Sequence, residues 1–438
     1  MSLKSIPTKF NPQIILFFLI LFFLPQQFGP HFWPSFSLVH GIRVDYLSPA
    51  IYISDVLIFL LFLLSFKNIF SNSLIKSFFS RKLFLFLVLI VLFPLFYTFE
   101  PLSLLYKLFK LFEVMYLGLF AAVALDKKHL FTALWILSLA AFLEALLGIG
   151  EFIKQGSLNG IFYFFGERFF TPSTLGEAVI NTTRGLLVRP YATFPHPNIL
   201  AFFLFMGAVF SSFVSHHEKN IAGKYTALFF FSVIEVCLFL TFSRVMLAIN
   251  ILFLLYSFLL FPIFSQRKHI KRIIVFCSAV ILLGIFFASF SFRFFSLSSI
   301  LNGVEPRTDL TLTSFQIFSR QPLFGVGLSN SFYYEGVLQK DFSPTRLQPV
   351  HNIFLLILSE AGILGLLVFW YFSLNSILVL YHKTKGYLGT YSFYEMVFIL
   401  FTAFLVQGMF DHFFFTTQQG LLMASFLFGL SYNKNFRP

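Results

Sequence analysis

The residues best suited to chemistry lie in and just after a polar stretch that runs between two apolar segments, from about residue 292 to residue 350. The stretch contains Arg307, Arg320 and Arg346, and it ends beside His351. Guanidinium groups bind phosphate oxygens through two parallel hydrogen bonds, and histidine exchanges protons near neutral pH. This combination suits a reaction at a phosphate-linked centre that also needs a base.

Two further arginines stand where apolar segments begin. Arg189 opens a proline-rich segment that ends at Asn198, which we expect to cap the following helix with free amides that can face an anion. Arg244 follows Thr241 in a link with hardly any loop, so it lies at or near a membrane surface, where an ionisable residue is costly and usually functional. The alternatives are a capped helix with a snorkelling arginine and a surface arginine in a tight hairpin.

His351 has competitors for the role of base, namely His31, His40, His196 and His412. Its place at the end of the long loop favours it over them, although a histidine at a helix end often has no function. Asp309 is close enough in sequence to neutralise Arg307 as a surface ion pair. No spacing of His, Asp and Glu matches a metal site, and no phosphate-binding loop is present, so we expect no metal and no cofactor.

The composition places these residues in a membrane protein. Of 438 residues, 58% are hydrophobic and 11% charged, and the mean hydropathy is +0.84. Both cysteines lie inside apolar segments, which argues against a disulfide or a thiolate site. We therefore predict an all-α integral membrane protein with residues 1–438 forming one polytopic domain.

About twelve apolar runs are long enough to cross a membrane. We predict spans at 10–28, 50–66, 83–99, 103–125, 130–150, 198–215, 225–242, 245–261, 273–291, 352–380, 393–410 and 417–432. The run 352–380 is too long for one straight span and contains Gly362 and Gly365, so we expect a short helix at the surface that then bends inward.

Lysines and arginines set the predicted sidedness. With both termini in the cytoplasm, the lysine-rich loops all fall inside, as the positive-inside rule requires. Residues 151–197 and 292–350 then form two long outer loops that carry short helices. This topology accounts for most of the net charge of +13, so no nucleic-acid partner is expected. Arginines gather on the outer side: Arg43, Arg168, Arg184, Arg189, Arg244, Arg293, Arg307, Arg320 and Arg346.

These features together resemble the O-antigen ligase family, the Wzy_C-type membrane glycosyltransferases. The similarity runs over residues 185–370. Its motifs are the segment from Arg189 to Asn198, the segment ending at Arg244, Arg307 with the turn 322–327, and the segment from His351 through 360–365. Each motif is short, and their order, spacing and common outer placement carry the resemblance.

The resemblance implies a GT-C-like helical transferase in the plasma (inner) membrane, whose donor is a polyprenyl-diphosphate-linked glycan and whose site faces the periplasmic or extracellular side. Arg244 and Arg307, with Arg189 at a less specific position, would bind the donor diphosphate. His351 would act on the acceptor hydroxyl without a metal. The acceptor can be a lipid, a glycan or a protein, because the superfamily also contains polysaccharide polymerases and O-oligosaccharyltransferases.

Two other classes compete with a transferase. A transporter or flippase for a lipid-linked glycan would bind diphosphate without catalysis, and it would need polar residues along a path through both leaflets. Asp55, Glu113, Glu144 and Glu235 are internal carboxylates, but they show no repeated spacing. A purely structural membrane subunit would leave the outer arginines and the long loop unexplained.

Overall fold

A computed structural model describes residues 11–78, 81–182, 185–260, 305–338, 347–384 and 391–433. The described chain is predominantly helical, and its strands form two small antiparallel hairpins in the connecting loops. The strands are β1 (Leu38–Val39) with β2 (Ile42–Arg43), and β3 (Val179–Thr182) with β4 (Gly185–Val188). The predicted all-α class agrees with this architecture.

Each predicted span within the described residues coincides with a helix. These helices are α1 (Pro12–Phe22), α2 (Ile53–Ser71), α4 (Arg81–Leu92), α5 (Pro101–Val123), α6 (Lys127–Lys154), α7 (Pro197–His217), α8 (Ile221–Leu240), α9 (Arg244–Leu260), α14 (Ile353–Thr384), α15 (Phe393–Gly408) and α17 (Gln418–Tyr432). The predicted span 273–291 lies outside the described residues. Shorter helices are α3 (Ser73–Phe78), α12 (Glu305–Arg320), α13 (Ser331–Leu338) and α16 (Phe413–Thr416), with 3-10 turns η1 (Ser35–Ser37), η2 (Asp45–Leu47), η3 (Phe93–Phe96) and η4 (Gly160–Phe165).

Five of the described helices, α2, α6, α7, α8 and α14, are long and apolar enough to cross a membrane. Others, including α1, α9 and α15, are apolar but shorter. A multi-pass membrane protein follows from these helices, while the number twelve stays a prediction.

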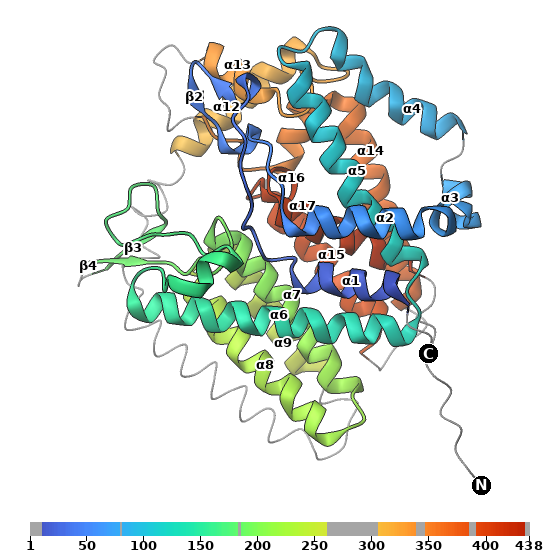
Figure 1. Ribbon diagram of the computed structural model, residues 1–438, viewed down its shortest axis with the longest axis vertical. Helices are drawn as coiled ribbons and strands as arrows, with labels where there is room; N and C mark the ends of the chain where they lie inside the picture. Colours follow the sequence, from blue (N-terminus) through green and yellow to red (C-terminus); the bar gives the residue numbers. More distant parts are fainter. Residues whose placement is uncertain are drawn as a thin grey trace.

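Helix α7 lies at the centre of the bundle. It is apolar on all sides, and 89% of its most hydrophobic window is buried, as expected of a helix surrounded by other helices. It packs against α6 and α8 on one side and meets α15 and α9 on the other. Figure 1 shows α6, α7, α8 and α9 in green and yellow-green next to a second group formed by α2, α5, α14, α15 and α17.

The two ends of the bundle differ in their charges. At one end Trp135 near the start of α6 donates to Glu218 after α7, and Lys383 near the end of α14 donates to the carbonyl of Asn433. Lys127, Lys128 and Lys219 are exposed at this lysine end. At the opposite end Arg189 donates to the carbonyl of Thr241, and Asn352 donates to that of Met409.

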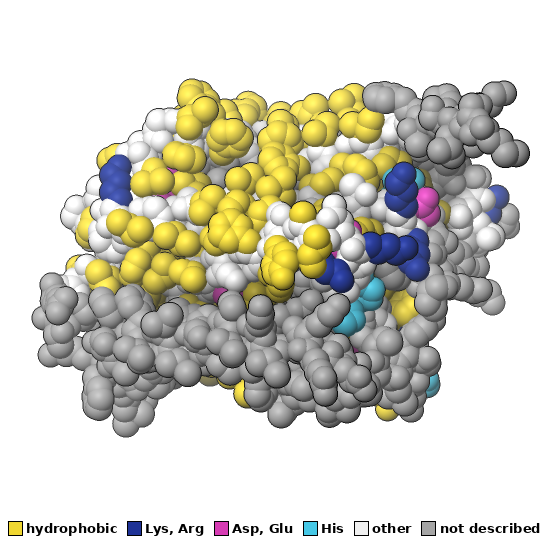
Figure 2. All heavy atoms as spheres, turned by 90° about the horizontal axis from the view of Figure 1, so that it is seen from below, with side chains coloured by type: hydrophobic (Ala, Val, Ile, Leu, Met, Phe, Trp, Pro, Cys, Tyr) yellow, Lys and Arg dark blue, Asp and Glu magenta, His cyan; other side chains and the backbone are white. Residues whose placement is uncertain are grey.

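We call this second end, where α7 and α14 begin and where α8 and α15 finish, the arginine end. The two hairpins, α12 and α13 gather on the left in Figure 1, away from both termini. Between the ends, hydrophobic side chains cover much of the described surface in Figure 2, and Lys, Arg and His side chains collect toward its right-hand edge. This pattern fits an apolar belt between two polar surfaces.

Helix α14 is broken at Gly362, whose φ of 67° and ψ of −171° are not helical. The turn 322–327 fills the break, because Val326 N donates to Ser359 O (3.0 Å) and Ile363 N donates to Pro322 O (2.9 Å). Gly325 sits in this turn with φ +71°, where a Cβ atom would come within 2.3 Å of the Glu360 backbone. The predicted bend near Gly362 is therefore confirmed, and the turn motif has a structural purpose: it fixes the short first part of α14, which begins beside His351.

Candidate functional site

His351 lies immediately before α14, at the arginine end. The next residue, Asn352, accepts hydrogen bonds from Phe354 N (2.9 Å) and Leu355 N (3.1 Å) through its side chain and so caps the helix. The Asn352 amide also donates to Met409 O (3.1 Å) at the end of α15. These contacts hold His351 next to the residues that follow α15.

The neighbour that this arrangement gives to His351 is Asp411. The distance from His351 Nδ1 to Asp411 Oδ1 is 3.9 Å, and the side chain of Asp411 is only 7% exposed. Nδ1 of His351 is buried and has no hydrogen-bond partner among the described residues. A small rotation of the ring would close this gap, as often happens when a catalytic site fills. The geometry assigns Nδ1 to the carboxylate and leaves Nε2 for a substrate.

Asp411 is itself held from two sides. Its Oδ1 accepts from the backbone of His412 (2.8 Å), and its Oδ2 accepts from Nδ2 of Asn198 (2.8 Å). Burial favours the neutral acid, but the interactions of the carboxylate with the imidazoles of His351, His412 and His196 outweigh burial and lower the pKa of Asp411 below its usual value. Asp411 is therefore a carboxylate at neutral pH.

Arg189 completes the same network. Its Nη2 donates to Asn198 Oδ1 (2.8 Å) and its Nε donates to Thr241 O (2.6 Å), so it links the start of α7 to the end of α8. Burial lowers the pKa of Arg189 to about 10, which leaves it charged at neutral pH. Because Nε and Nη2 of its guanidinium group already donate to protein atoms, a positioning role is favoured over the predicted diphosphate contact.

The expectation that Asn198 caps α7 was wrong. The cap is His196, whose Nδ1 accepts from Asn198 N (3.1 Å). Burial, with the positive charge of Arg189, lowers the pKa of His196 to about 3. His196 is thus a neutral structural group, and the Asn198 side chain is free to bridge Arg189 and Asp411.

Arg244 and Arg307 lie at the starts of α9 and α12, respectively, and both are exposed. A left-handed residue, Phe242 with φ +50°, reverses the chain between α8 and α9, which confirms the predicted tight link before Arg244. The charge of Arg307 acts on both Arg244 and His412, so the two guanidinium groups belong to one region beside the histidines. In the described part of the chain Arg307 forms no ion pair with Asp309.

Helix α12 is tied to α14, since Ser314 Oγ donates to Leu355 O (3.2 Å). The prediction that the stretch 292–350 carries short helices is confirmed by α12, which lies against the helix that follows His351. Arg320, at the other end of α12, lies over the ring of Tyr334 (5.8 Å to its centroid). Arg184, Arg293 and Arg346 lie outside the described residues.

His412 is the competitor closest to His351, with ring centroids 5.1 Å apart. Its Nδ1 lies 2.8 Å from Thr416 Oγ1, and burial lowers its pKa to about 4, although Asp411 acts in the opposite direction. It is therefore neutral and already engaged, which makes His351 the better base. The histidines His31 and His40 are exposed in the loop that precedes α2.

His351, Asp411 and His412 also form the one group of possible metal ligands found among the described residues, with ligand atoms within 4.8 Å of one another. Two ligand atoms at about 2.1 Å from a zinc ion cannot be more than about 4.2 Å apart, so the group would have to contract to bind it. His412 Nδ1 and Asp411 Oδ1 would also lose their present partners. The geometry suits a proton-transfer pair better than a metal site.

Sequence reasoning missed Asp411 as a member of the site. His412 was considered only as a competitor of His351, and Asp411 only as an isolated outer carboxylate, because nothing in the local sequence relates them to His351 or to Asn198. The adjacent pair of a carboxylate and a histidine, placed between two apolar runs, was the available signal.

The bundle of apolar helices thus carries a histidine and carboxylate pair at the same end as two exposed arginines. Residues 227–370 match the family model Wzy_C, described as O-antigen ligase. This region, about a third of the chain, is similar to the O-antigen ligase family, and the long apolar helices mark a multi-pass membrane protein. No curated protein matched the chain at a significant level.

Proposed function

We propose that the protein transfers a glycan from a polyprenyl-diphosphate donor to an acceptor hydroxyl at the outer face of the plasma membrane. The observation that supports this most directly is the shared location of Arg244, Arg307 and the His351–Asp411 pair at the end opposite the lysine-rich loops. Because lysine-rich loops favour the cytoplasm, the arginine end would face outward.

Arg244 and Arg307 bind the donor diphosphate in this proposal. When the bond between the anomeric carbon and the phosphate oxygen breaks, negative charge builds on the leaving diphosphate. Two fixed guanidinium groups stabilise that charge without a metal ion. Arg189 supports the site by holding Asn198, and through it Asp411, in place.

His351 takes the proton of the acceptor hydroxyl through Nε2, while Asp411 faces Nδ1 and stabilises the imidazolium that forms. The acceptor oxygen bonds to the anomeric carbon, and the diphosphate departs with the electron pair of the broken bond. A single displacement of this kind inverts the anomeric configuration. The acceptor can be a lipid-linked core, a growing polysaccharide or a protein, which corresponds to ligase, polymerase or O-oligosaccharyltransferase activity.

A transporter of lipid-linked glycans is the second candidate. The observation that favours it is the buried group formed by Lys110 with Asp55 and Glu113 between α2 and α5, since buried charges in membrane helices often mark transport paths. This group lies in the half of α5 nearest the arginine end. Its polar residues do not continue toward the lysine end, as a transport path through both leaflets would require.

Reconstituted protein incubated with a polyprenyl-diphosphate glycan and candidate acceptors separates the two candidates. The transferase releases free polyprenyl diphosphate and forms a glycan-bearing product in equal amounts, with or without a chelator such as EDTA. A transporter moves the intact donor across the bilayer and releases none. Activity that is lost with EDTA and restored by a divalent ion would contradict the metal-free mechanism.

A further inference from the structure

A polar cavity of about 480 Å³ lies at the arginine end and is connected to the candidate base through two packed rings. Tyr46 lines the cavity, its ring packs on His412 with centroids 5.5 Å apart, and His412 packs on His351. Thr416, the partner of His412, lines the cavity as well. The volume lies within the range of sites for small molecules, about 300–1,000 Å³.

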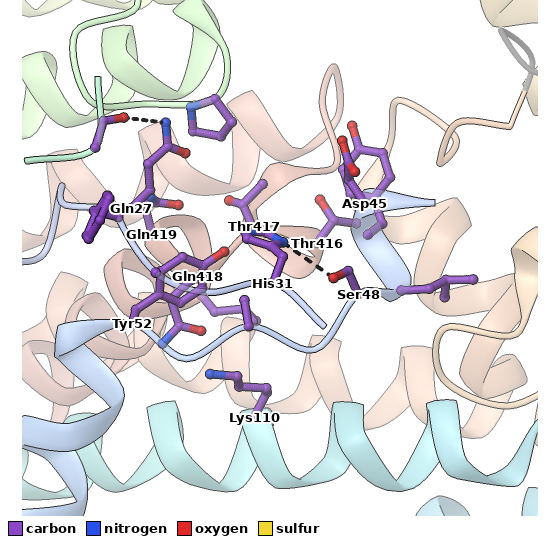
Figure 3. A pocket seen from close by; sticks show the side chains of 18 of the residues that line it. Gln27, His31, Asp45, Ser48, Tyr52, Lys110, Thr416, Thr417, Gln418 and Gln419 are labelled. Atoms are coloured by element: carbon purple, nitrogen blue, oxygen red, sulfur yellow. Dashed lines mark hydrogen bonds between the residues drawn. The ribbon is translucent and has the colours of Figure 1, made fainter. Parts of the chain in front are cut away.

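Several separate parts of the chain build this cavity, and Figure 3 shows three of them. The loop before α2 supplies His31, Asp45, Ser48 and Tyr52, helix α5 supplies Lys110, and the α16–α17 junction supplies the run from Thr416 to Gln419. The lining is rich in hydroxyl, amide and aromatic groups. A sugar ring has matching chemistry, because it presents hydroxyls around its rim and C–H groups on its faces.

Two glutamines in the wall have hydrogen-bonding capacity left for a ligand. Gln418 Nε2 donates to Asp55 Oδ1 (2.6 Å), and Gln419 Nε2 donates to Pro25 O (3.5 Å). Among the described residues, neither amide oxygen accepts a hydrogen bond, and both side chains are more than nine-tenths buried. Each amide oxygen can therefore accept from a hydroxyl of a ligand in the cavity, and each such hydrogen bond would stabilise the bound ligand.

The charged residues of the wall do not favour an anion. Lys110 contacts Asp55 and lies 3.4 Å from Glu113, and Arg168 pairs with Glu177 at 3.0 Å. Lys107 donates to the carbonyl of Phe415. The cations in the wall already have protein partners, and Asp45 and Glu167 add negative charge to it. A neutral ligand fits this balance better than an acidic one.

We propose that this cavity binds a neutral sugar residue of the acceptor glycan, an assignment that rests on the proposed transferase function. The reason for choosing the acceptor is the row of rings between the cavity and the proposed base, because Tyr46 lines the cavity and packs on His412, which packs on His351. The base acts on the acceptor hydroxyl, so the acceptor is the substrate whose sugar residues lie near it. The proposed donor contacts, Arg244 and Arg307, are absent from the lining of the cavity.

Binding is tested with Trp33, which lines the cavity, as the reporter. In purified protein carrying Trp135→Phe and Trp370→Phe, Trp33 is the sole tryptophan left. Its fluorescence is followed during titration with the methyl glycosides of glucose, galactose and mannose, with N-acetylglucosamine, and with glucuronate and inorganic phosphate. At least one neutral sugar should give a saturable change. Saturation by glucuronate or phosphate alone, or by none of the probes, overturns the proposal.

Gln419→Leu removes one hydrogen-bond acceptor from the wall. The Kd of the sugar should therefore rise roughly tenfold, which is the effect of losing one hydrogen bond to a neutral group. Gln316→Leu on the exposed surface of α12 is the matched control and should bind like the parent. Tyr163→Ala, which alters an exposed side chain of the lining, serves if Gln419→Leu does not fold. Unchanged binding in the folded cavity variants would place the sugar elsewhere and overturn the assignment.

Transfer kinetics test whether the bound sugar belongs to the acceptor or to the donor. Gln419→Leu should raise the KM for the acceptor roughly tenfold, with the KM for the donor unchanged. A raised KM for the donor instead would refute the acceptor assignment. If the parent binds a neutral sugar yet releases no polyprenyl diphosphate with any acceptor, the proposed transferase function has failed while the sugar site itself stands.

Discussion

Asp411→Asn tests whether the carboxylate acts on His351 through its charge. The substitution keeps the size of the side chain and an oxygen that can accept from Asn198, so the network around it should persist. Two unit charges 3.9 Å apart interact by about 4 kcal/mol at an effective dielectric constant of 20. The side chain of His351 is 25% exposed, so water screens part of this interaction.

If half of that energy survives screening, about 2 kcal/mol of transition-state stabilisation is lost, which corresponds to roughly a 30-fold lower kcat. The KM for the donor should change little, because Asp411 does not face the proposed diphosphate site. The assay is the initial rate of polyprenyl diphosphate release at saturating donor and acceptor, measured from pH 4 to pH 9.

The pH profile separates charge from structure. The pKa of Asp411 lies below its usual value, so the carboxylate stays ionised as the pH falls. A negative charge close to a base favours the protonated form of that base, so removing the charge in Asp411→Asn should move the acidic limb of the activity profile to lower pH. A kcat like that of the parent with an unmoved acidic limb would refute the reasoning. Asn198→Ala, which loosens Asp411 without removing its charge, should leave the limb in place.

Three further predictions address the arginines, the turn and the sidedness. Arg244→Lys and Arg307→Lys keep the charge but lose the bidentate contact, so each should lower kcat/KM for the donor by at least tenfold. Arg320→Lys, on the same helix as Arg307, should not, and equal activity of all three variants in the release assay would argue against diphosphate binding. Gly325→Ala should lower the midpoint of thermal unfolding, because its Cβ would come within 2.3 Å of the Glu360 backbone. Gly176→Ala, also at positive φ but with open space around it, measures the cost of the backbone conformation alone, and equal midpoints for the two variants would contradict the packing argument. In a background lacking the native cysteines, an impermeant thiol reagent should label Ser173→Cys in intact cells and Lys219→Cys only after permeabilisation, and the reverse pattern would invert the topology.

Local sequence was sufficient for the helical runs, the tight link before Arg244 and the break at Gly362. These features depend on apolar length, on the shortness of the link between runs, and on a glycine within an overlong run.

The site required contacts between distant residues, which one sequence does not reveal. Asn198 and Asp411 are 213 positions apart, and only the packed bundle shows that they share a hydrogen bond. The same holds for Arg189, whose hydrogen bond to the carbonyl of Thr241 joins residues 52 positions apart. Which loop residues are exposed was also not evident from one sequence, because Ser157 and Ser329 lie in segments predicted as outer loops and yet both are buried.

The most direct test of the transferase mechanism is the rate of polyprenyl diphosphate release by His351→Ala, compared with the parent and with His412→Ala at equal amounts of folded protein. Loss of a general base lowers turnover by about two to four orders of magnitude, so His351→Ala should fall at least 100-fold below the parent while still binding donor. His412→Ala, which removes a buried and neutral ring, should retain more activity than His351→Ala. Normal release by His351→Ala together with an inactive His412→Ala would contradict the assignment of His351 as the base.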